Sequence, residues 1–507
     1  MPGTGETVNQ QISGFFDDAP YRSFTTGDVV LEPTATECRP DHADLTTRLT
    51  DQINLRAPFM SAAMDTVTMA EMAIAQAKEG GIGIIHGLLS PDQKRKEARR
   101  VKLHLNGVVE DPICAEEDQT VASLLDMCHD RGFEFRTFPV TDSAGKLRGM
   151  LTNHNLRFWT KGEDQKVTDI MTAADEVISA PMSTTIPEAY QKMRREQLNT
   201  LPLIGTDGSV QGLYIWSDVE RLHTGNPEKY ALDNDGHLLV GVAIGSRPEE
   251  AEEDVYETRQ YTDVYVIDSS HGNALEVRET VVHLRQVFGP DPQIIAGNIV
   301  DQESAILLGD AGASAIKVGI GGGSICTTRI QTGVGMGQLK ATYRVATGIN
   351  NNGLNIPVIS DGGIMYPGDA AKLIAVGAES VMMGSVFAGT DEAPGKITTT
   401  KDGRTVKEYR GMGSAAAQLA GRQVRGYTSG AESSEVFPEG VEAQVDYKGP
   451  VRRIIFDFKS GLRNAMANFN ARTIKDFQRN ARLGEVTTAG AVEGTPHIGR
   501  VGQIIRH

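Results

Sequence analysis

Cysteine is scarce in this chain of 507 residues, which contains only Cys38, Cys114, Cys128 and Cys326. The four cysteines are far apart and show no paired spacing, so the sequence suggests neither a disulfide framework nor a zinc site. No ligand set for iron is visible either. We therefore expect reduced thiols, with Cys326 available as a thiolate.

Long apolar runs and an excess of positive charge are also missing. No apolar run is long enough to span a bilayer, and the N-terminal residues lack the basic and apolar segments of a leader peptide, so we expect a cytoplasmic protein. The chain has 50 Lys and Arg against 66 Asp and Glu, a formal net charge of -16. That balance argues against nucleic acid or an anionic membrane as the main partner, and an anionic ligand would need an amide-lined or locally positive site.

Short apolar runs recur along the chain, and helix-like segments follow many of them. Eight runs occur, at residues 57–60 leading into Ser61, 81–86, 238–245, 264–268, 294–298, 315–319, 357–361 and 380–384. This rhythm predicts an α/β fold, a (β/α)8 TIM barrel whose active site lies at the carboxyl ends of the strands. A doubly wound open sheet is the competing fold.

An inserted module is expected between the second and third runs, because roughly 150 residues are too many for one strand-to-helix connection. Within it, residues 138–152 resemble residues 201–215, a duplication with a period of about 60 residues. We expect the barrel in residues 1–105 and 226–507. The module would occupy 106–225, as two copies at about 106–163 and 164–225.

The duplicated pattern resembles a tandem pair of cystathionine-β-synthase-type (CBS) domains, which in many families bind adenine nucleotides and regulate the host enzyme. In such domains a Thr or Ser followed three residues later by Asp often holds the ribose. Here Thr152 is followed by Asn155, and Ile215 by Asp218, so neither copy keeps both residues. Binding of an adenine or guanine nucleotide and a purely structural module are equally open.

The segment GIGGGSICTTR, residues 319–329, carries the strongest chemical signal. Its glycines permit positive φ and let backbone amides approach a ligand, so the loop is suited to cradle a phosphate. Cys326 is then a candidate nucleophile. A tight turn beside a buried thiol explains the same residues equally well.

Four further motifs accompany this loop: SAAMDTVT at 61–68, VIDSSHG at 266–272, IIAGNIVD at 294–301 and VISDGGIMYPGD at 358–369. With them the chain resembles the IMP dehydrogenase family over nearly its whole length. The same motifs occur in GMP reductase, a close relative. The resemblance implies a thiolate of Cys326 that adds to C2 of inosine 5'-monophosphate (IMP) while hydride passes to NAD. Hydrolysis of the resulting thioimidate would release xanthosine 5'-monophosphate, a rate-limiting type of step in guanine nucleotide synthesis.

The resemblance also implies the residues of each subsite. Substrate would contact Met64, Ser324, Asp361, Gly362, Gly363, Gly384, Ser385, Tyr409, Gly411, Met412, Gly413 and Glu439. Asp361 would accept the ribose hydroxyls, and the backbone amides of Gly362, Gly363, Gly384 and Ser385 with the hydroxyl of Ser324 would hold the monophosphate. NAD would contact Asp268, Ser269, Ser270, Asn298, Gly319 and Gly321. Amides of Ser324 and Ile325 would lower the pKa of the cysteine. For the polar residues at strand ends, a simple helix cap is the alternative.

A potassium ion is implied at the carbonyls of Gly321, Gly323 and Cys326. Those of Glu493, Gly494 and Thr495 from a neighbouring subunit would complete its shell. The family implies a homotetramer, which CBS-like modules can pair into octamers.

Dehydrogenase and reductase differ in the segment that follows Gly411. In IMP dehydrogenases it contains a mobile flap, here about 414–440, with an Arg-Tyr pair that activates water. This chain reads Arg425-Gly426-Tyr427, with one glycine between the expected neighbours. Either Tyr427 serves from one position later, or hydrolysis leans on Thr328 with Glu439. The alternatives are a GMP reductase that releases ammonia from GMP using NADPH, and a nucleotide-binding regulatory protein with weakened catalysis.

The flap interpretation predicts that Arg425→Ala slows steady-state turnover and leaves the first burst of hydride transfer largely intact, because Arg425 would act only in the hydrolysis step. Rapid-mixing absorbance at the NADH band separates the two phases. An unchanged steady-state rate would remove Arg425 from the mechanism.

Overall fold

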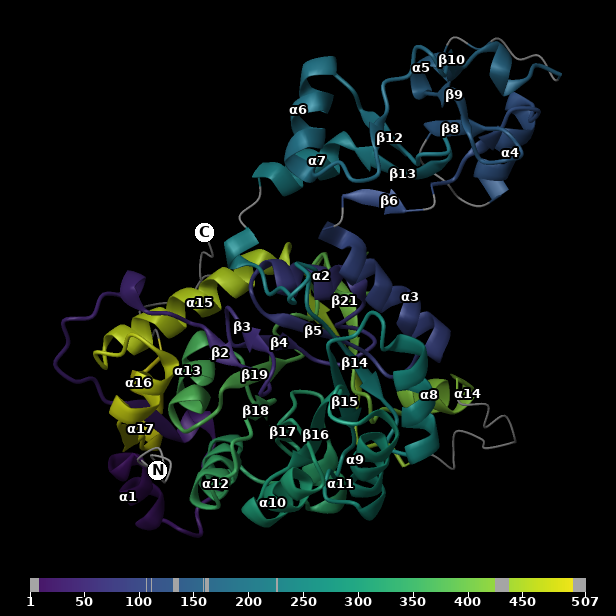
Figure 1. Ribbon diagram of the computed structural model, residues 1–507. Coiled ribbons are helices and arrows are strands. Elements are labelled where there is room, and N and C mark those ends of the chain that lie inside the picture. The colour runs from purple at the N-terminus through teal and green to yellow at the C-terminus, as the bar shows by residue number, and fades with distance from the viewer. Residues whose placement is uncertain are drawn as a thin grey trace. The chain divides into compact units, whose positions relative to one another are not determined.

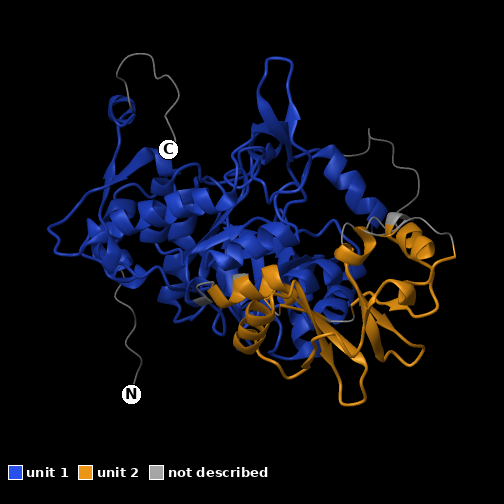
Figure 2. Cartoon of the chain, turned by 90° about the horizontal axis from the view of Figure 1, so that it is seen from above, with its two compact units in different colours: residues 1–102, 228–507 blue, residues 103–227 orange. Residues whose placement is uncertain are grey.

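The computed structural model describes residues 9–105, 107–110, 112–130, 136–157, 159, 164–224, 227–424 and 437–495. The chain divides into two compact units, residues 1–102 with 228–507 and residues 103–227 (Figure 2). Among the described residues, no helix is both long and apolar enough to cross a membrane.

The first unit is built on a closed barrel of eight strands, in the order β14-β15-β16-β17-β18-β19-β4-β5, with every neighbouring pair parallel (Figure 1). The strands are β4 (Phe59–Ser61), β5 (Ile82–Ile85), β14 (Val240–Ile244), β15 (Val264–Asp268), β16 (Gln293–Ile299), β17 (Ala315–Val318), β18 (Val358–Asp361) and β19 (Ser380–Met383). Each coincides with one of the eight apolar runs, and β16 extends one residue beyond its run at each end. The barrel is confirmed, and the open sheet is excluded because β5 pairs with β14 and closes the ring.

Helices follow the strands and cover the barrel wall. They are α2 (Ala70–Lys78), α3 (Pro91–Lys102), α8 (Pro248–Thr258), α9 (Leu275–Phe288), α10 (Gln302–Asp310), α12 (Gln338–Asn351), α13 (Pro367–Ala375) and α15 (Val451–Ala467). Local sequence sets their ends: Asp301 caps α10 by accepting the Ser304 N–H, and Pro367 opens α13 with its fixed φ. Apolar side chains such as Met60, Ile84, Val266 and Ile359 fill the interior of the barrel, which is therefore a packed core and not a channel.

Smaller elements decorate the two ends of the barrel. The helices are α1 (Gln10–Asp17), α11 (Thr328–Thr332), α14 (Ala415–Val424), α16 (Ile474–Asn480) and α17 (Thr488–Glu493). The strands are β1 (Val29–Leu31) paired with β23 (Leu483–Glu485), β2 (Thr47–Arg48) with β3 (Asn54–Leu55), and the sheet β20 (Thr398–Thr399), β21 (Thr405–Arg410) and β22 (Glu442–Asp446).

A partly buried ion cluster joins the chain on both sides of the inserted unit. Lys102, the last residue of α3, places its Nζ 2.7 Å from Asp233 Oδ2 and 2.6 Å from Asp263 Oδ1. Asp263 also accepts the N–H of Val240, the first residue of β14, at 2.8 Å. The segments that leave and rejoin the barrel are therefore held at one place.

The second unit consists of two similar halves, each with a four-stranded sheet. One half contains β7 (Ala115–Glu116), α4 (Val121–Asp130), β8 (Phe138–Thr141), β9 (Leu147–Leu151), α5 (Asn153–Arg157) and β10 (Thr172–Ala173). The other contains β6 (Val108–Glu110), β11 (Ala180–Pro181), α6 (Ile186–Glu196), β12 (Thr200–Ile204), β13 (Val210–Ile215) and α7 (Trp216–Thr224). The hydroxyl of Thr152 donates to Asn155 Oδ1 at 2.6 Å, so these two side chains bond to each other.

Candidate active site

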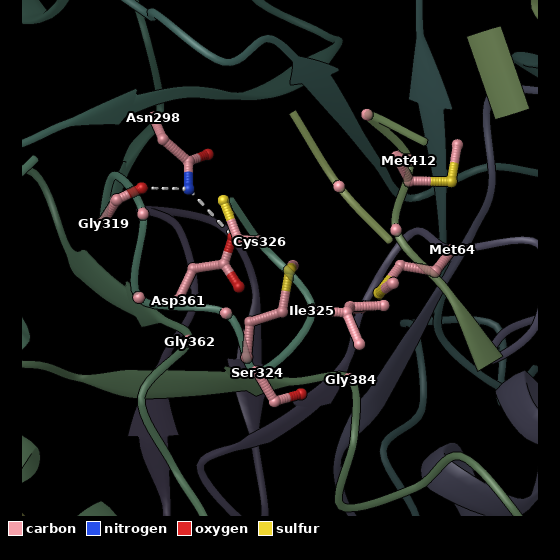
Figure 3. A pocket seen from close by; sticks show the side chains of 18 of the residues that line it. Met64, Asn298, Gly319, Ser324, Ile325, Cys326, Asp361, Gly362, Gly384 and Met412 are labelled. Carbon is pink, nitrogen blue, oxygen red and sulfur yellow. Dashed lines mark hydrogen bonds between the residues drawn. The ribbon is translucent and has the colours of Figure 1, made fainter. Parts of the chain in front are cut away.

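A cavity of about 690 Å³ opens where the barrel strands end (Figure 3). Its lining comes from residues within the last part of, or just after, β4, β15, β16, β17, β18 and β19, and from the segments around Gly411 and Glu439. Of the sequence-predicted residues it brings together Met64, Asp268, Ser269, Ser270, Asn298, Gly319, Gly321, Gly323, Ser324, Cys326, Thr328, Asp361, Gly362, Gly363, Gly384, Ser385, Tyr409, Gly411, Met412, Gly413 and Glu439.

Three of the described predicted residues do not join this lining, and two others, Arg425 and Tyr427, lie outside the described residues. Glu493, Gly494 and Thr495 stand at the end of α17, which Figure 1 shows beside α16 and apart from α11, the helix that begins at Thr328. Within one chain, the two predicted sets of potassium carbonyls therefore do not meet.

The cysteine loop is held by main-chain pairing with the segment around Glu439. Cys326 forms an antiparallel bridge with Gly440. The Thr327 N–H donates to the Glu439 carbonyl at 2.9 Å, and the Val441 N–H donates to the Ile325 carbonyl at 3.0 Å. This pairing brings the Glu439 side chain to the thiol.

Three side chains are consequently connected by two successive polar contacts. Cys326 Sγ lies 3.2 Å from Thr328 Oγ1, and the Thr328 hydroxyl donates to Glu439 Oε2 at 2.8 Å. The thiol is only partly buried and faces the cavity, so the alternative of an enclosed thiol beside a turn is wrong. Because its carboxylate accepts from Thr328, Glu439 is not a free surface carboxylate. A hydroxyl hydrogen-bonded to a carboxylate can take a proton from a nearby water and pass it to that carboxylate.

Glycines and Tyr409 also line the cavity. A Cβ on Gly384 would stand 2.9 Å from both Met64 Sδ and Tyr409 Oη, so a larger residue here would force these side chains to shift. Burial raises the pKa of Tyr409 to about 12, and a hydrogen bond with Ser324 has a smaller, opposing effect. The raised pKa keeps the phenol neutral. Of the amides predicted to hold phosphate, that of Gly362 already donates to the Met382 carbonyl at 3.3 Å.

The polar residues at strand ends are not helix caps. The helices after β15, β16 and β18 are capped at Ala274, Asp301 and Tyr366, several residues beyond Asp268, Asn298 and Asp361. Asn298 was expected beside the dinucleotide. Its amide donates to the Gly319 carbonyl at 2.8 Å and to Asp361 Oδ2 at 3.0 Å, and so it also supports the residue predicted to hold the ribose (Figure 3).

Sequence reasoning missed two polar residues of the cavity, Lys317 and Gln418. Lys317 lies inside a run that reads as an apolar strand, and a charged residue within a buried strand was the available signal. Gln418 lies on α14, and its amide donates to the carbonyls of Gly413 and Phe437, both at 3.0 Å. No sequence signal distinguishes Gln418 from other polar residues of that helix.

A second polar cluster holds Arg410, the residue just before the segment Gly411–Gly413. The guanidinium Nε of Arg410 donates to Asp65 Oδ2 at 2.8 Å, and the backbone N–H of Arg410 donates to Thr66 Oγ1 at 3.3 Å. This ties β21 to the loop after β4. His86, at the end of β5, is buried near the same ion pair, and its Nδ1 accepts the Leu88 N–H at 3.2 Å.

These observations define a (β/α)8-barrel enzyme with a candidate cysteine nucleophile beside a Thr–Glu pair. The IMP dehydrogenase / GMP reductase domain matches residues 23–497. Inosine-5'-monophosphate dehydrogenase of Aquifex aeolicus is 40% identical over 479 residues, 93% of this chain and 95% of that protein. The enzyme of that name from Pasteurella multocida is 38% identical, over 94% of this chain and 96% of its own length.

Among solved structures, GMP reductase from Trypanosoma brucei in complex with guanosine 5'-monophosphate matches with a TM-score of 0.83 and 33% identity. The match covers 95% of this chain and 99% of that chain. The chain belongs to the IMP dehydrogenase/GMP reductase family, which confirms the resemblance seen in its motifs.

His86 gives the fold a dependence on pH. Burial, the largest cause, lowers the pKa of His86 to about 4. Because the pKa of His86 is lower in the folded state than in the unfolded state, the folded state is favoured while His86 is neutral. This contribution of His86 to the free energy of unfolding is complete above about pH 6.5 and is lost as the pH falls toward 4. Between pH 7.5 and 5 we expect the wild type to lose about 2 kcal/mol that His86→Gln does not lose.

Urea unfolding at the two pH values measures this difference. The matched control is His42→Gln, since His42 is exposed, and it should retain the wild-type pH dependence. If His86→Gln and the wild type lose equal stability between the two pH values, His86 is not the group that titrates.

Proposed function

We propose that this protein oxidises IMP to xanthosine 5'-monophosphate with NAD. The observation that carries the proposal is the alignment of Cys326, Thr328 and Glu439, with Glu439 at the far end of a segment that spans 28 positions from Gly411. A segment of that length followed by Pro438-Glu439-Gly440 is typical of the bacterial dehydrogenases. The dehydrogenases at 38 to 40% identity support the same direction of reaction.

The first step is capture of the purine. The thiolate of Cys326 adds to C2, and the hydride then leaves C2 and makes a thioimidate in which the C2–Sγ bond persists. NAD, when bound, accepts that hydride. Asp268 and the two following serines line the side of the cavity where the dinucleotide would lie.

Hydrolysis is the second step. Water adds to C2, the C2–Sγ bond breaks, and the product leaves with oxygen at C2. The water must lose its proton, and Thr328 with Glu439 provides an acceptor within 2.8 Å of the hydroxyl. Arg425 and Tyr427 would assist from the flap.

Binding of the nucleotide divides among three parts of the cavity. Asp361 would accept the ribose hydroxyls. The amides of Gly363, Gly384 and Ser385 and the hydroxyl of Ser324 would hold the monophosphate, as the corresponding loops do in other barrels. Met64, Tyr409 and residues 411–413 would contact the purine and the phosphate.

A potassium ion would be held by carbonyls alone. Among the described residues no three His, Cys, Asp or Glu side chains form a metal cluster, which suits a cation that takes uncharged oxygens. Carbonyls at the last turn of a helix lack partners within the helix, and Glu493 closes α17. The proposed ion would therefore join the cysteine loop of one chain to this helix end of another, within a homotetramer.

For the second unit we propose the CBS-like role of binding an adenine or guanine nucleotide. Its two similar halves support a paired site, and the Thr152–Asn155 bond is the departure from the usual ribose-binding pattern. Pairing of these units would also account for octamers.

GMP reductase is the second candidate. The solved GMP reductase matches 95% of this chain, including the second unit, and the altered Arg-Gly-Tyr sequence weakens the case for flap-assisted hydrolysis. The two reactions share the cysteine and the nucleotide site and differ in the chemistry after capture.

An absorbance assay at the NADH band decides between them. A gain of signal with IMP and NAD supports the dehydrogenase, and a loss with GMP and NADPH supports the reductase. Silence in both assays with retained nucleotide binding would indicate a regulatory protein. In either enzyme Cys326→Ser should abolish turnover, and persistent activity of that variant would exclude covalent capture.

The Thr–Glu pair generates a separate prediction for Glu439→Gln. Loss of the carboxylate removes the proton acceptor from hydrolysis, so steady-state turnover should fall roughly 100-fold while the burst of hydride transfer persists. The control is Glu442→Gln, an exposed carboxylate three positions later on β22, which should behave as the wild type. Equal rates for Glu439→Gln and the wild type would contradict the assignment.

A further inference from the structure

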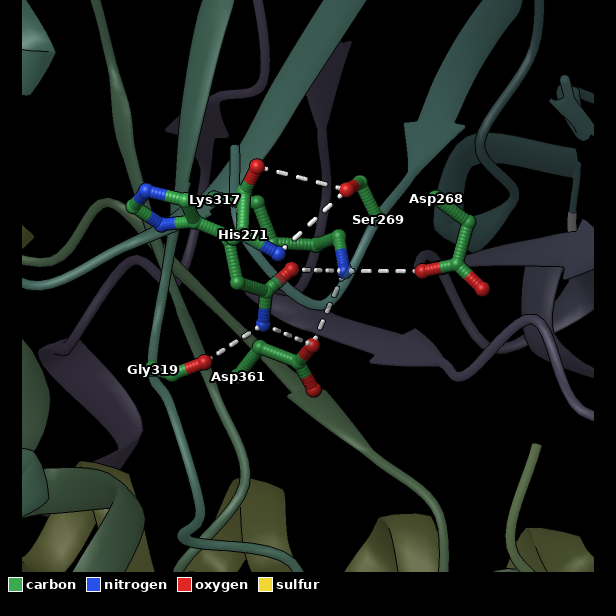
Figure 4. Close-up of polar contacts among 7 residues, drawn as sticks. Asp268, Ser269, His271, Lys317, Gly319 and Asp361 are labelled. Carbon is green, nitrogen blue, oxygen red and sulfur yellow. Dashed lines mark hydrogen bonds and ion pairs between the residues drawn. The ribbon is translucent and has the colours of Figure 1, made fainter. Parts of the chain in front are cut away.

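Lys317 lies beneath the cavity on β17, and its side chain is only 3% exposed. Its Nζ is 3.0 Å from Asp361 Oδ2 and 3.3 Å from Asp268 Oδ1, and it also donates to Asn298 Oδ1 (Figure 4). An ammonium group has three N–H donors. Here the three acceptors account for all of them, and they come from the carboxyl ends of β15, β16 and β18.

The charge balance of the cavity depends on this residue. Among the described residues that line it, Lys317 is the one cation, against the carboxylates of Asp268, Asp361 and Glu439. Asp268 and Asp361 keep 33% and 21% of their side chains exposed, so each also faces the space where a ligand would lie.

The environment of Lys317 favours its protonated form. Burial alone would lower its pKa, but the charges of Asp361 and Asp268 outweigh burial, so that the pKa is raised from the ordinary lysine value. A charged hydrogen-bond donor in a water-poor site holds its acceptors strongly.

We propose that Lys317 is a positioning residue that couples the nucleotide subsite to the dinucleotide subsite. It acts through Asp361 on the ribose of the bound monophosphate and through Asp268 on the dinucleotide, and it touches neither ligand. The inference rests on the proposed function for the identity of the two ligands. It explains why a buried lysine interrupts an apolar strand.

Lys317→Met tests the proposal, because methionine keeps most of the length and removes the charge. Calorimetry with IMP and with GMP should show binding on the order of 10- to 100-fold weaker, and the KM for the dinucleotide should rise by a similar factor. A residue with a merely structural role would lower the amount of active protein without changing either constant.

Two further variants separate the routes. Asp361→Asn should weaken the monophosphate and leave the KM for the dinucleotide near the wild-type value, and Asp268→Asn should do the reverse. Only loss of Lys317 should affect both ligands. Once Lys317 is methionine, the additional effect of either Asn substitution should be smaller than in the wild type, since the contact is already gone.

Two controls guard against misfolding. Lys94 is as buried as Lys317 and forms an ion pair with Asp254, at 2.7 Å and away from the cavity lining, so Lys94→Met should destabilise the fold while leaving both binding constants unchanged. Lys317→Arg keeps a cation and should recover much of the lost affinity, even if Lys317→Met proves insoluble.

Wild-type affinity for both ligands in Lys317→Met, or an effect on only one of them, would overturn the coupling. So would a failure of Lys317→Arg to recover more affinity than Lys317→Met. The proposed reaction fails separately, when the wild type does not oxidise IMP. In that case binding of IMP or GMP and the KM for NADPH in the reductase direction still test Lys317.

Discussion

Main-chain pairing between the cysteine loop and the segment around Glu439 is the constraint on which the site depends. Hydrogen bonds from Thr327 to Glu439 and from Val441 to Ile325 lie on either side of Cys326, so the main chains that carry the thiol and the carboxylate are held next to each other. Thr328 and Glu439 are separated by 111 positions in sequence. Backbone bonds place them within reach of each other more firmly than the single side-chain bond between them would.

The barrel contributes the remaining geometry. Parallel strands that close into a ring bring their carboxyl ends to one face, and so Asp268, Asn298 and Asp361 meet although helices separate them in sequence. Their side chains then need a common partner, because two neighbouring carboxylates repel each other. Lys317 provides that partner from the strand between Asn298 and Asp361.

Much of this arrangement could be predicted from sequence. The strands were recognisable because a parallel strand buried on both faces reads as a short apolar run, as in 264–268 and 357–361. The cavity residues followed from motifs at the ends of those runs. Lys317 was missed because its partners are set by strand register, which motifs do not reveal. The amide of Gly362 was assigned to phosphate because sequence does not show that Met382 already accepts it.

Strand β15 has a further consequence for the stiffness of the site. Asp263, immediately before the strand, is held by Lys102, and Asp268, its last residue, is held by Lys317. Five residues of extended chain span roughly 15 Å. The strand therefore has an ion pair with a lysine at each of its two ends, one at each end of the barrel. Movement of Asp268 along the strand axis would lengthen the ion pair of Asp263 with Lys102 or that of Asp268 with Lys317. The two ion pairs therefore restrict the position of the Asp268 carboxylate in the absence of ligand.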